Sequence, residues 1–160
     1  MTEKATFAAG CFWGVEYAFS QVTGVKGTVV GYTGGHTADP TYEQVCSHTT
    51  GHAEAVMVEF DPKVVTYEQL VKYFFKIHDP TTKNRQGPDI GDQYRSAIFT
   101  HNPEQQQIAE QVREALTRGR AYRQAIVTDI APAPTFYPAE EYHQEYYVKH
   151  KGKIQCPINL

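Results

Sequence analysis

Segments with strand patterns and segments with helix patterns follow one another in the order β-α-β-β-α-β, and this order constrains the fold most. Residues 14–22, for example, carry Val15, Ala18, Phe19 and Val22 at helical spacing. In chain order the six segments are 4–9, 14–22, 25–33, 52–60, 67–77 and 94–101. The order is the ferredoxin-like one, in which helices cover one face of a sheet with antiparallel pairs. We therefore predict an α/β fold of the α+β type, a two-layer sandwich on a ferredoxin-like core.

Capping residues support the helices of this core and of the chain that follows it. Thr66 is the predicted N-cap of the helix at 67–77, and Gln69 completes a capping box. Asn102 caps a further helix that opens with Pro103. The apolar positions of that helix recur every four residues, at Ile108, Val112 and Leu116.

The rest of the chain adds a strand, a short helix and a tail to the core. Residues 124–130 have a strand pattern, and a proline-rich link leads to a short predicted helix within 138–150. The last residues, about 150–160, read as a loose tail that carries Cys156. We expect residues 1–160 to form a single domain.

Length, charge and cysteine content exclude several classes of protein. A chain of 160 residues buries roughly 68–70% of its unfolded surface, so it folds without disulfides. The net charge of −3, from 15 basic and 18 acidic residues, disfavours nucleic acid as a partner. No apolar run approaches the ~18 residues of a membrane span, and the N-terminus lacks the apolar stretch of a signal peptide. Three widely spaced cysteines fit a reducing compartment, so we expect a cytoplasmic protein.

A thiol and two large aromatic side chains stand between two glycines near the N-terminus. Cys11 is followed by Phe12 and by Trp13, the one tryptophan of the chain, and Gly10 and Gly14 bracket them. The three side chains could be core residues, because cysteine and aromatic residues are often buried. Alternatively, the glycines shape a turn that presents Cys11 at a helix N-terminus, where the dipole lowers the pKa of a thiol.

Glu54 is an acid on the apolar face of the predicted strand at 52–60. It shares that face with Val56, Val58 and Phe60, because side chains alternate along a strand. Burial would raise the pKa of its carboxyl and suit it to donate a proton at neutral pH. The alternative is a glutamate at the mouth of the strand that reaches water or pairs with a lysine.

Two long polar loops could bring further groups to one pocket. They span residues 34–51 and 79–93 and are longer than most connections in a compact domain, as functional loops often are. Tyr42 lies in the first loop, Asp89 lies in the second, and Tyr94 follows the second directly. Tyrosine hydroxyls donate well to a polar oxygen. Each of these residues could equally serve only in packing or loop capping.

The two other cysteines differ in their settings. Cys156 lies near the chain end, from where it could reach a distant thiol. Cys46 lies in a short predicted helical turn, and we interpret it as structural.

Histidine spacing does not predict a metal site. His48 and His52 are four residues apart, but Gly51 interrupts any helix between them, and no third ligand has regular spacing. We expect neither a metal nor a cofactor.

With these residues in view, the chain resembles the A-type peptide methionine sulfoxide reductases. The run GCFWG at residues 10–14 is similar to the family's active-site signature. Further matches in order and spacing, within residues 5–147, are GYTGG (31–35), PTYEQVCS (40–47), TGHAEAV (50–56), the YEQL–FF–HDPT series (67–81) and DQYRSAIF (92–99). The resemblance implies a two-layer α/β domain that reduces the S-epimer of methionine sulfoxide, free or in proteins, to methionine.

The resemblance also implies roles for individual residues. Cys11 would be the nucleophile, and the substrate methyl group would meet Phe12 and Trp13. The sulfoxide oxygen would bind to Tyr42, Glu54 and Tyr94, with support from Asp89. Attack by Cys11 would give a sulfenic acid, which a second thiol condenses with to form a disulfide. Cys156 is the candidate for this resolving role and Cys46 the alternative; thioredoxin would then reduce the disulfide. We expect a monomer.

Two other functions stay open on the residues alone. Cys11 could serve a different thiol enzyme, such as a peroxidase or a cysteine hydrolase, although a hydrolase needs a histidine paired with the thiol and none is adjacent in sequence. A ferredoxin-like domain could also be a binding module without catalysis. A binding module would need neither Glu54 on the apolar face nor a cysteine in the tail.

Overall fold

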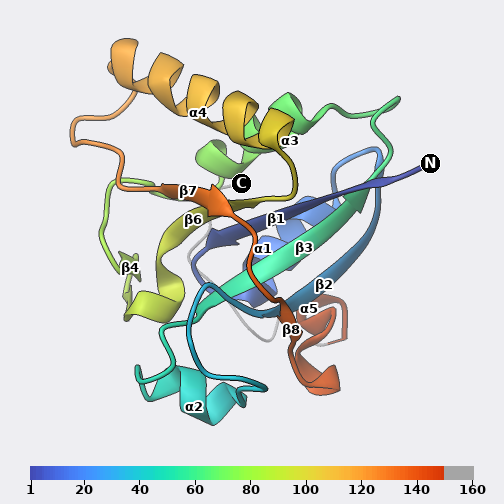
Figure 1. Cartoon of the computed structure of the whole chain (residues 1–160), viewed down its shortest axis with the longest axis vertical. Coiled ribbons are helices and arrows are strands. Elements are labelled where there is room, and N and C mark those ends of the chain that lie inside the picture. The colour runs from blue at the N-terminus through green and yellow to red at the C-terminus, as the bar shows by residue number, and fades with distance from the viewer. Residues whose placement is uncertain (150–160) are drawn as a thin grey trace.

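A computed structural model of the chain describes residues 1–149 and has one main sheet. Its six strands are β1 (Glu3–Ala9), β2 (Val25–Thr33), β3 (Ala53–Phe60), β6 (Ser96–Thr100), β7 (Asp129–Pro132) and β8 (Tyr137–Pro138). Across the sheet they lie in the order β7-β6-β1-β3-β2-β8 (Figure 1). The four central strands pair antiparallel, β7 is parallel to β6 and β8 is antiparallel to β2.

Helices complete the predicted core and extend it. They are α1 (Phe12–Ser20), α2 (Tyr42–Cys46), α3 (Tyr67–Lys76), α4 (Pro103–Arg118) and α5 (Tyr146–Lys149), with short 3-10 turns η1 (Asp92–Tyr94) and η2 (Glu141–His143). A small hairpin joins β4 (Arg85–Gln86) to β5 (Asp89–Ile90). The elements β1, α1, β2, β3, α3 and β6 have the ferredoxin-like order, and their strands have its spatial order β6-β1-β3-β2. The predicted fold class is therefore confirmed.

The two faces of the sheet are covered in different ways. Helices α1 and α3 cover one face with the main core, in which the Phe7 ring stacks on Phe19 at 4.9 Å between centroids and on Phe74 at 5.3 Å. The other face is lined mainly by alanines, and Ala133 and Phe136 pack on it. Figure 1 shows the link from β7 to β8 crossing this face, opposite α1. The small side chains on this face allow the link between β7 and β8, which has no regular secondary structure, to lie directly on the sheet.

Most predicted boundaries agree with the structure, and so do the predicted caps. The Thr66–Gln69 capping box is formed, and the Asn102 side chain accepts a hydrogen bond from the backbone of Gln105. The long loops are more ordered than expected, since the first contains α2 and the second contains β4, β5 and η1.

The predicted strand at 124–130 is wrong over most of its length. The chain pairs with β6 only from Asp129 onward. Before that point Val127 N donates to Pro80 O, and Thr128 O accepts from Arg113 Nη1. These backbone groups therefore bond to a loop and a helix, and no ladder forms.

The short helix expected within 138–150 is split into η2 and α5. Glu145 between them has a left-handed backbone, with φ of 52°, which interrupts a helix. None of the helices described within residues 1–149 is long and apolar enough to span a membrane.

Candidate active site

The turn that carries Cys11 joins the end of β1 to the start of α1. Gly10 adopts a φ of 101°, and a Cβ atom there would lie only 2.8 Å from Cγ of Gln86. Both observations require glycine at this position. Cys11 itself is half-buried and is the N-cap residue of α1. The structure thus places the thiol at a helix N-terminus, as the second interpretation of this motif predicted.

Glu54 lies beside this turn, near the start of β3. Its side chain is only 1% exposed, on the face whose other residues belong to the main core. Its Oε1 atom accepts a hydrogen bond of 3.1 Å from Phe12 N, the first amide of α1. The predicted orientation toward the core is confirmed, and one hydrogen bond brings the carboxyl to the residue after Cys11.

The hydroxyls of Tyr42 and Tyr94 share their surroundings with Glu54. Burial raises the pKa of Tyr42, and the charge of Glu54 raises it further. The same two causes raise the pKa of Tyr94, with a smaller contribution from Cys11. Both hydroxyls therefore stay protonated at neutral pH and can act as donors. Tyr42 owes its position to α2, which begins with a capping box formed by Thr41 and Gln44.

Asp89 reaches the site through the small β4–β5 hairpin. It pairs with Gln86, whose side chain packs against Gly10 and whose amide exchanges two hydrogen bonds of 2.9 Å with the backbone of Asp79. Burial raises the pKa of Asp89, and its charge acts on Tyr94. The loop at 79–93 is thereby fixed against the Cys11 turn.

The two aromatic residues after Cys11 have different positions. Phe12 is buried and packs beside Tyr42, with 6.5 Å between ring centroids. Trp13 is half-buried, and its ring stacks on Tyr146 at 4.1 Å with an interplanar angle of 13°. We call Trp13 and Tyr146 together the aromatic wall. Phe12 is buried on the inner side of this region, whereas the aromatic wall lies nearer the surface.

The C-terminal segment, defined here as residues 137–149, supplies site residues that the sequence analysis missed. His143 is 1% exposed, and its Nδ1 accepts a hydrogen bond of 2.9 Å from Trp13 Nε1. Burial lowers the pKa of His143, which keeps the ring neutral and able to accept. Glu140 accepts from the Tyr32 hydroxyl at 2.8 Å and from Tyr42 N at 3.0 Å.

Histidines of the first long loop bind loop groups instead of converging on a metal. The His52 ring accepts from Gly35 N at 2.9 Å and lies 2.6 Å from Thr37 O. His48 Nδ1 lies 2.8 Å from Gln93 Oε1, which links the two long loops. Over residues 1–149 no three His, Cys, Asp or Glu side chains are grouped to hold a metal ion.

Of the two remaining cysteines, Cys46 lies within the residues that the structure describes. Cys156 lies outside the described residues. Cys46 is at the end of α2 and half-buried. Burial raises the pKa of its thiol, a hydrogen bond with Tyr42 partly offsets this, and the charge of Glu54 raises the pKa further. The raised pKa disfavours the thiolate that would attack a sulfenic acid.

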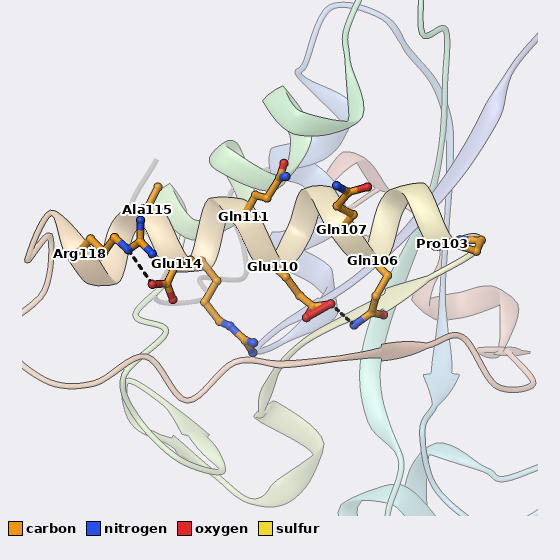
Figure 2. Close-up of a pocket in the computed structure, with 9 residues that line it drawn as sticks. Pro103, Gln106, Gln107, Glu110, Gln111, Glu114, Ala115 and Arg118 are labelled. Carbon is orange, nitrogen blue, oxygen red and sulfur yellow. Dashed lines mark hydrogen bonds and ion pairs between the residues drawn. The ribbon is translucent and has the colours of Figure 1, made fainter.

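A large hollow elsewhere on the surface lies along α4 (Figure 2). Its volume is about 720 Å³, and it is lined by polar side chains such as Gln107 and Glu110. Two of the contacts drawn there join neighbouring turns of the helix, Gln106 to Glu110 and Arg118 to Glu114. The hollow contains none of the predicted site residues, so it is an ordinary solvated helix face.

Comparisons with known proteins agree with this geometry. The family model described as peptide methionine sulfoxide reductase matches residues 3–160. The chain is 62% identical over 153 residues to the peptide methionine sulfoxide reductase MsrA of Methanosarcina acetivorans, covering 96% of this chain and 81% of the relative.

Solved structures are also similar to this chain. Reduced Mxr1 from Saccharomyces cerevisiae superposes with a TM-score of 0.91 at 37% identity, covering 98% of this chain and 90% of Mxr1. Mxr1 in complex with Trx2 has a TM-score of 0.64 at 27% identity, covering 91% and 84% of the two chains. The resemblance first seen in the GCFWG motif is confirmed: the chain belongs to the A-type peptide methionine sulfoxide reductase family.

Proposed function

We propose that Cys11 is the nucleophile with which this methionine sulfoxide reductase attacks the sulfur of the S-epimer, and that Glu54 is the acid that protonates the departing oxygen. The observation that carries this assignment is the 3.1 Å hydrogen bond from Phe12 N to Glu54 Oε1. It joins a buried carboxyl to the residue that follows a thiol at the N-terminus of α1. A sulfoxide held there would have its sulfur facing Cys11 and its oxygen facing Glu54.

The chemical step transfers oxygen and two electrons. The Cys11 thiolate, favoured by the amides and dipole of α1, attacks the sulfoxide sulfur while the oxygen takes up a proton. Attack forms a bond between Cys11 Sγ and the substrate sulfur. This bond and the S–O bond then both break as the protonated oxygen bonds to Cys11 Sγ, so methionine leaves and Cys11 holds the oxygen as a sulfenic acid. Methionine sulfur is thereby reduced and cysteine sulfur oxidised. Since Phe12 N–H already donates to Oε1, Glu54 would carry the transferred proton on Oε2.

The other site residues bind and orient the substrate. The hydroxyls of Tyr42 and Tyr94 donate to the sulfoxide oxygen, since a phenolic hydroxyl is protonated at neutral pH and the pKa values of these two are raised further. Asp89 supports this polar side next to Tyr94. Phe12 and Trp13 receive the methyl group on the sulfur, since an apolar slot beside a donor set matches the two ends of a sulfoxide.

Recycling requires a second thiol and an external reductant. Condensation of the Cys11 sulfenic acid with the Cys156 thiol gives a disulfide and water, and a dithiol of the thioredoxin class then reduces the disulfide by exchange. The half-buried thiol of Cys46, with its raised pKa, is the less suitable partner. The yeast relative crystallised in complex with Trx2 supports thioredoxin as the reductant.

We further propose that the chain acts as one catalytic domain over residues 1–160, as a monomer in the cytoplasm. Within residues 1–149, one main six-stranded sheet and the helices that pack on it share one main hydrophobic core, which supports one domain.

The test is a stereospecific assay. Purified protein is incubated with each epimer of methionine sulfoxide separately, with dithiothreitol as reductant, and methionine is quantified. We expect consumption of the S-epimer alone. Equal consumption of both epimers would contradict the proposed binding geometry, and consumption of neither would contradict the activity.

A further inference from the structure

Glu16 is a buried acid on α1 that the reaction described above does not use. It lies one helical turn after Trp13, and its side chain is only 2% exposed. Burial raises the pKa of its carboxyl above the ordinary value, so the fold holds the group where ionisation is disfavoured. Buried polar groups of this kind are bonded, and the donors that reach Glu16 indicate what it holds in place.

Two donors from distant parts of the chain reach this carboxyl. Thr28 Oγ1, on β2, donates to Oε2 at 2.9 Å. Glu145 N, in the C-terminal segment, donates to Oε1 at 2.7 Å. A side chain of helix α1 therefore binds the backbone of the C-terminal segment directly.

Glu145, whose amide binds Glu16, is the residue at which the chain changes direction. Glu145 has a φ of 52°, a left-handed conformation that is disfavoured for any residue with a Cβ atom. The next two side chains return to α1: the Tyr146 ring stacks on Trp13 at 4.1 Å, and Tyr147 meets Tyr17 edge-on at 6.0 Å. The bond to Glu16 thus stabilises the turn that presents Tyr146 to Trp13.

Solvent has little room to replace this bond. The space enclosed between α1, Thr28 and residues 145–148 has a volume of about 20 Å³, enough for about one water molecule. Loss of the carboxyl would leave the amide of Glu145 with at most this one water as acceptor, in place of a carboxyl oxygen fixed at 2.7 Å. The segment would be expected to leave its left-handed turn.

We propose that Glu16 is a positioning residue for the aromatic wall. Its carboxyl fixes Glu145 in the left-handed turn and so holds the Tyr146 ring against Trp13. The kinetic consequence rests on the proposed function, in which Trp13 receives the substrate methyl group. The placement of Trp13 against Tyr146 does not depend on that function. Since Glu16 acts through Glu145 and Tyr146, it affects substrate binding and leaves the chemical step unchanged.

The experiment uses Trp13 as its own probe, because it is the one tryptophan of the chain. Glu16→Met removes both acceptor oxygens and keeps a side chain of similar length. Glu16→Gln keeps an oxygen for Glu145 N–H, and Thr28→Val removes only the other hydrogen bond. Acrylamide quenching of tryptophan fluorescence is measured for each variant, together with kcat and KM for methionine sulfoxide with dithiothreitol.

We expect Glu16→Met to increase quenching and to raise KM roughly tenfold with kcat unchanged. A tenfold change corresponds to the free energy of one aromatic contact. Glu16→Gln and Thr28→Val should resemble the unaltered protein. Unchanged quenching and KM in Glu16→Met would overturn the proposal, and so would a Glu16→Gln variant that behaves like Glu16→Met. If the unaltered protein lacks reductase activity, the proposed function fails, while quenching still decides the role of Glu16.

A measurement on the unaltered protein covers the case in which Glu16→Met does not fold, as judged by circular dichroism. Amide hydrogen exchange followed by NMR reports directly on Glu145 N–H. We expect this amide to exchange as slowly as the amides within α1. Exchange as fast as that of an exposed loop amide would overturn the proposal.

Discussion

Two regions of the molecule build the site in different ways. Cys11 and Glu54 come from regular elements, the β1–α1 junction and β3, and one backbone amide of α1 joins them. The C-terminal segment has little regular structure, and side-chain hydrogen bonds to Glu16, Trp13 and Val30 hold it in place. The difference indicates a division of labour. In the proposed function, the regular elements fix the reacting groups, and the C-terminal segment shapes the surface that receives the substrate.

The largest effect is expected from Cys11→Ser, which removes the proposed nucleophile from the regular part of the site. Methionine formation should fall to background because a serine hydroxyl cannot replace a thiolate here. Formation is measured with the S-epimer and dithiothreitol, and circular dichroism checks the fold. Cys46→Ser is the matched control and should stay active. Activity retained in Cys11→Ser would mean that the site is built around another group.

Cys156→Ser should separate chemistry from recycling. One equivalent of methionine should form per protein, because the Cys11 sulfenic acid can still be made, but turnover driven by thioredoxin should stop. Methionine is quantified first without reductant and then with thioredoxin. Undiminished cycling would assign the resolving role to Cys46 or to direct reduction.

His143→Phe should weaken binding more than chemistry. The change keeps an aromatic ring but removes the acceptor for Trp13 Nε1, and a lost hydrogen bond of this kind corresponds to roughly a tenfold rise in KM. Steady-state kinetics give KM and kcat separately. His101→Phe is the control, because His101 bonds Thr6 outside the site. A fall in kcat without a change in KM would contradict the division of labour.

The smallest effect on activity is expected from His78→Gln, which tests how the regular part is stabilised. His78 bonds Phe74 O and Ser96 Oγ, and burial lowers its pKa to about 4, from 6.5. Between these pH values the unfolded chain binds a proton that the folded protein excludes. The contribution of His78 to the free energy of unfolding is therefore fully present above pH 6.5. It falls by about 3 kcal/mol as the pH drops to 4.

The measurement for His78 is the free energy of unfolding from urea denaturation at several pH values. His78→Gln has no group that titrates in this window, so its stability should fall less steeply with acid than that of the unaltered protein. Equal slopes would show that other groups account for the acid sensitivity.

The sequence predicted one region of the site much better than the other. Alternation along β3 was enough to place Glu54 on the core side, and the glycine bracket indicated the turn of Cys11. No such periodicity exists for His143 or Glu140, whose positions depend on contacts with Trp13, Tyr32 and Tyr42 far away in the chain. The prediction of a strand at 124–130 was wrong for a related reason, since the backbone partners of this segment lie in a loop and in α4. Patterns with a local cause could be read, and contacts between distant segments could not.

If Cys11 and Glu54 carry the chemistry, the rate of a single turnover in Glu54→Gln must depend on pH in a particular way. Methionine formation is measured at saturating S-epimer in the variant and in the unaltered protein, from about pH 5.5 to about pH 9. Cys11 is common to both proteins, so its ionisation largely cancels in the ratio of their rates. A general acid contributes about 10²–10⁴-fold, so the variant should be slower by that order at low pH. The ratio should shrink as pH rises, because the unaltered protein loses the proton of Glu54. A ratio near one, or a large ratio that does not change with pH, would contradict the acid role.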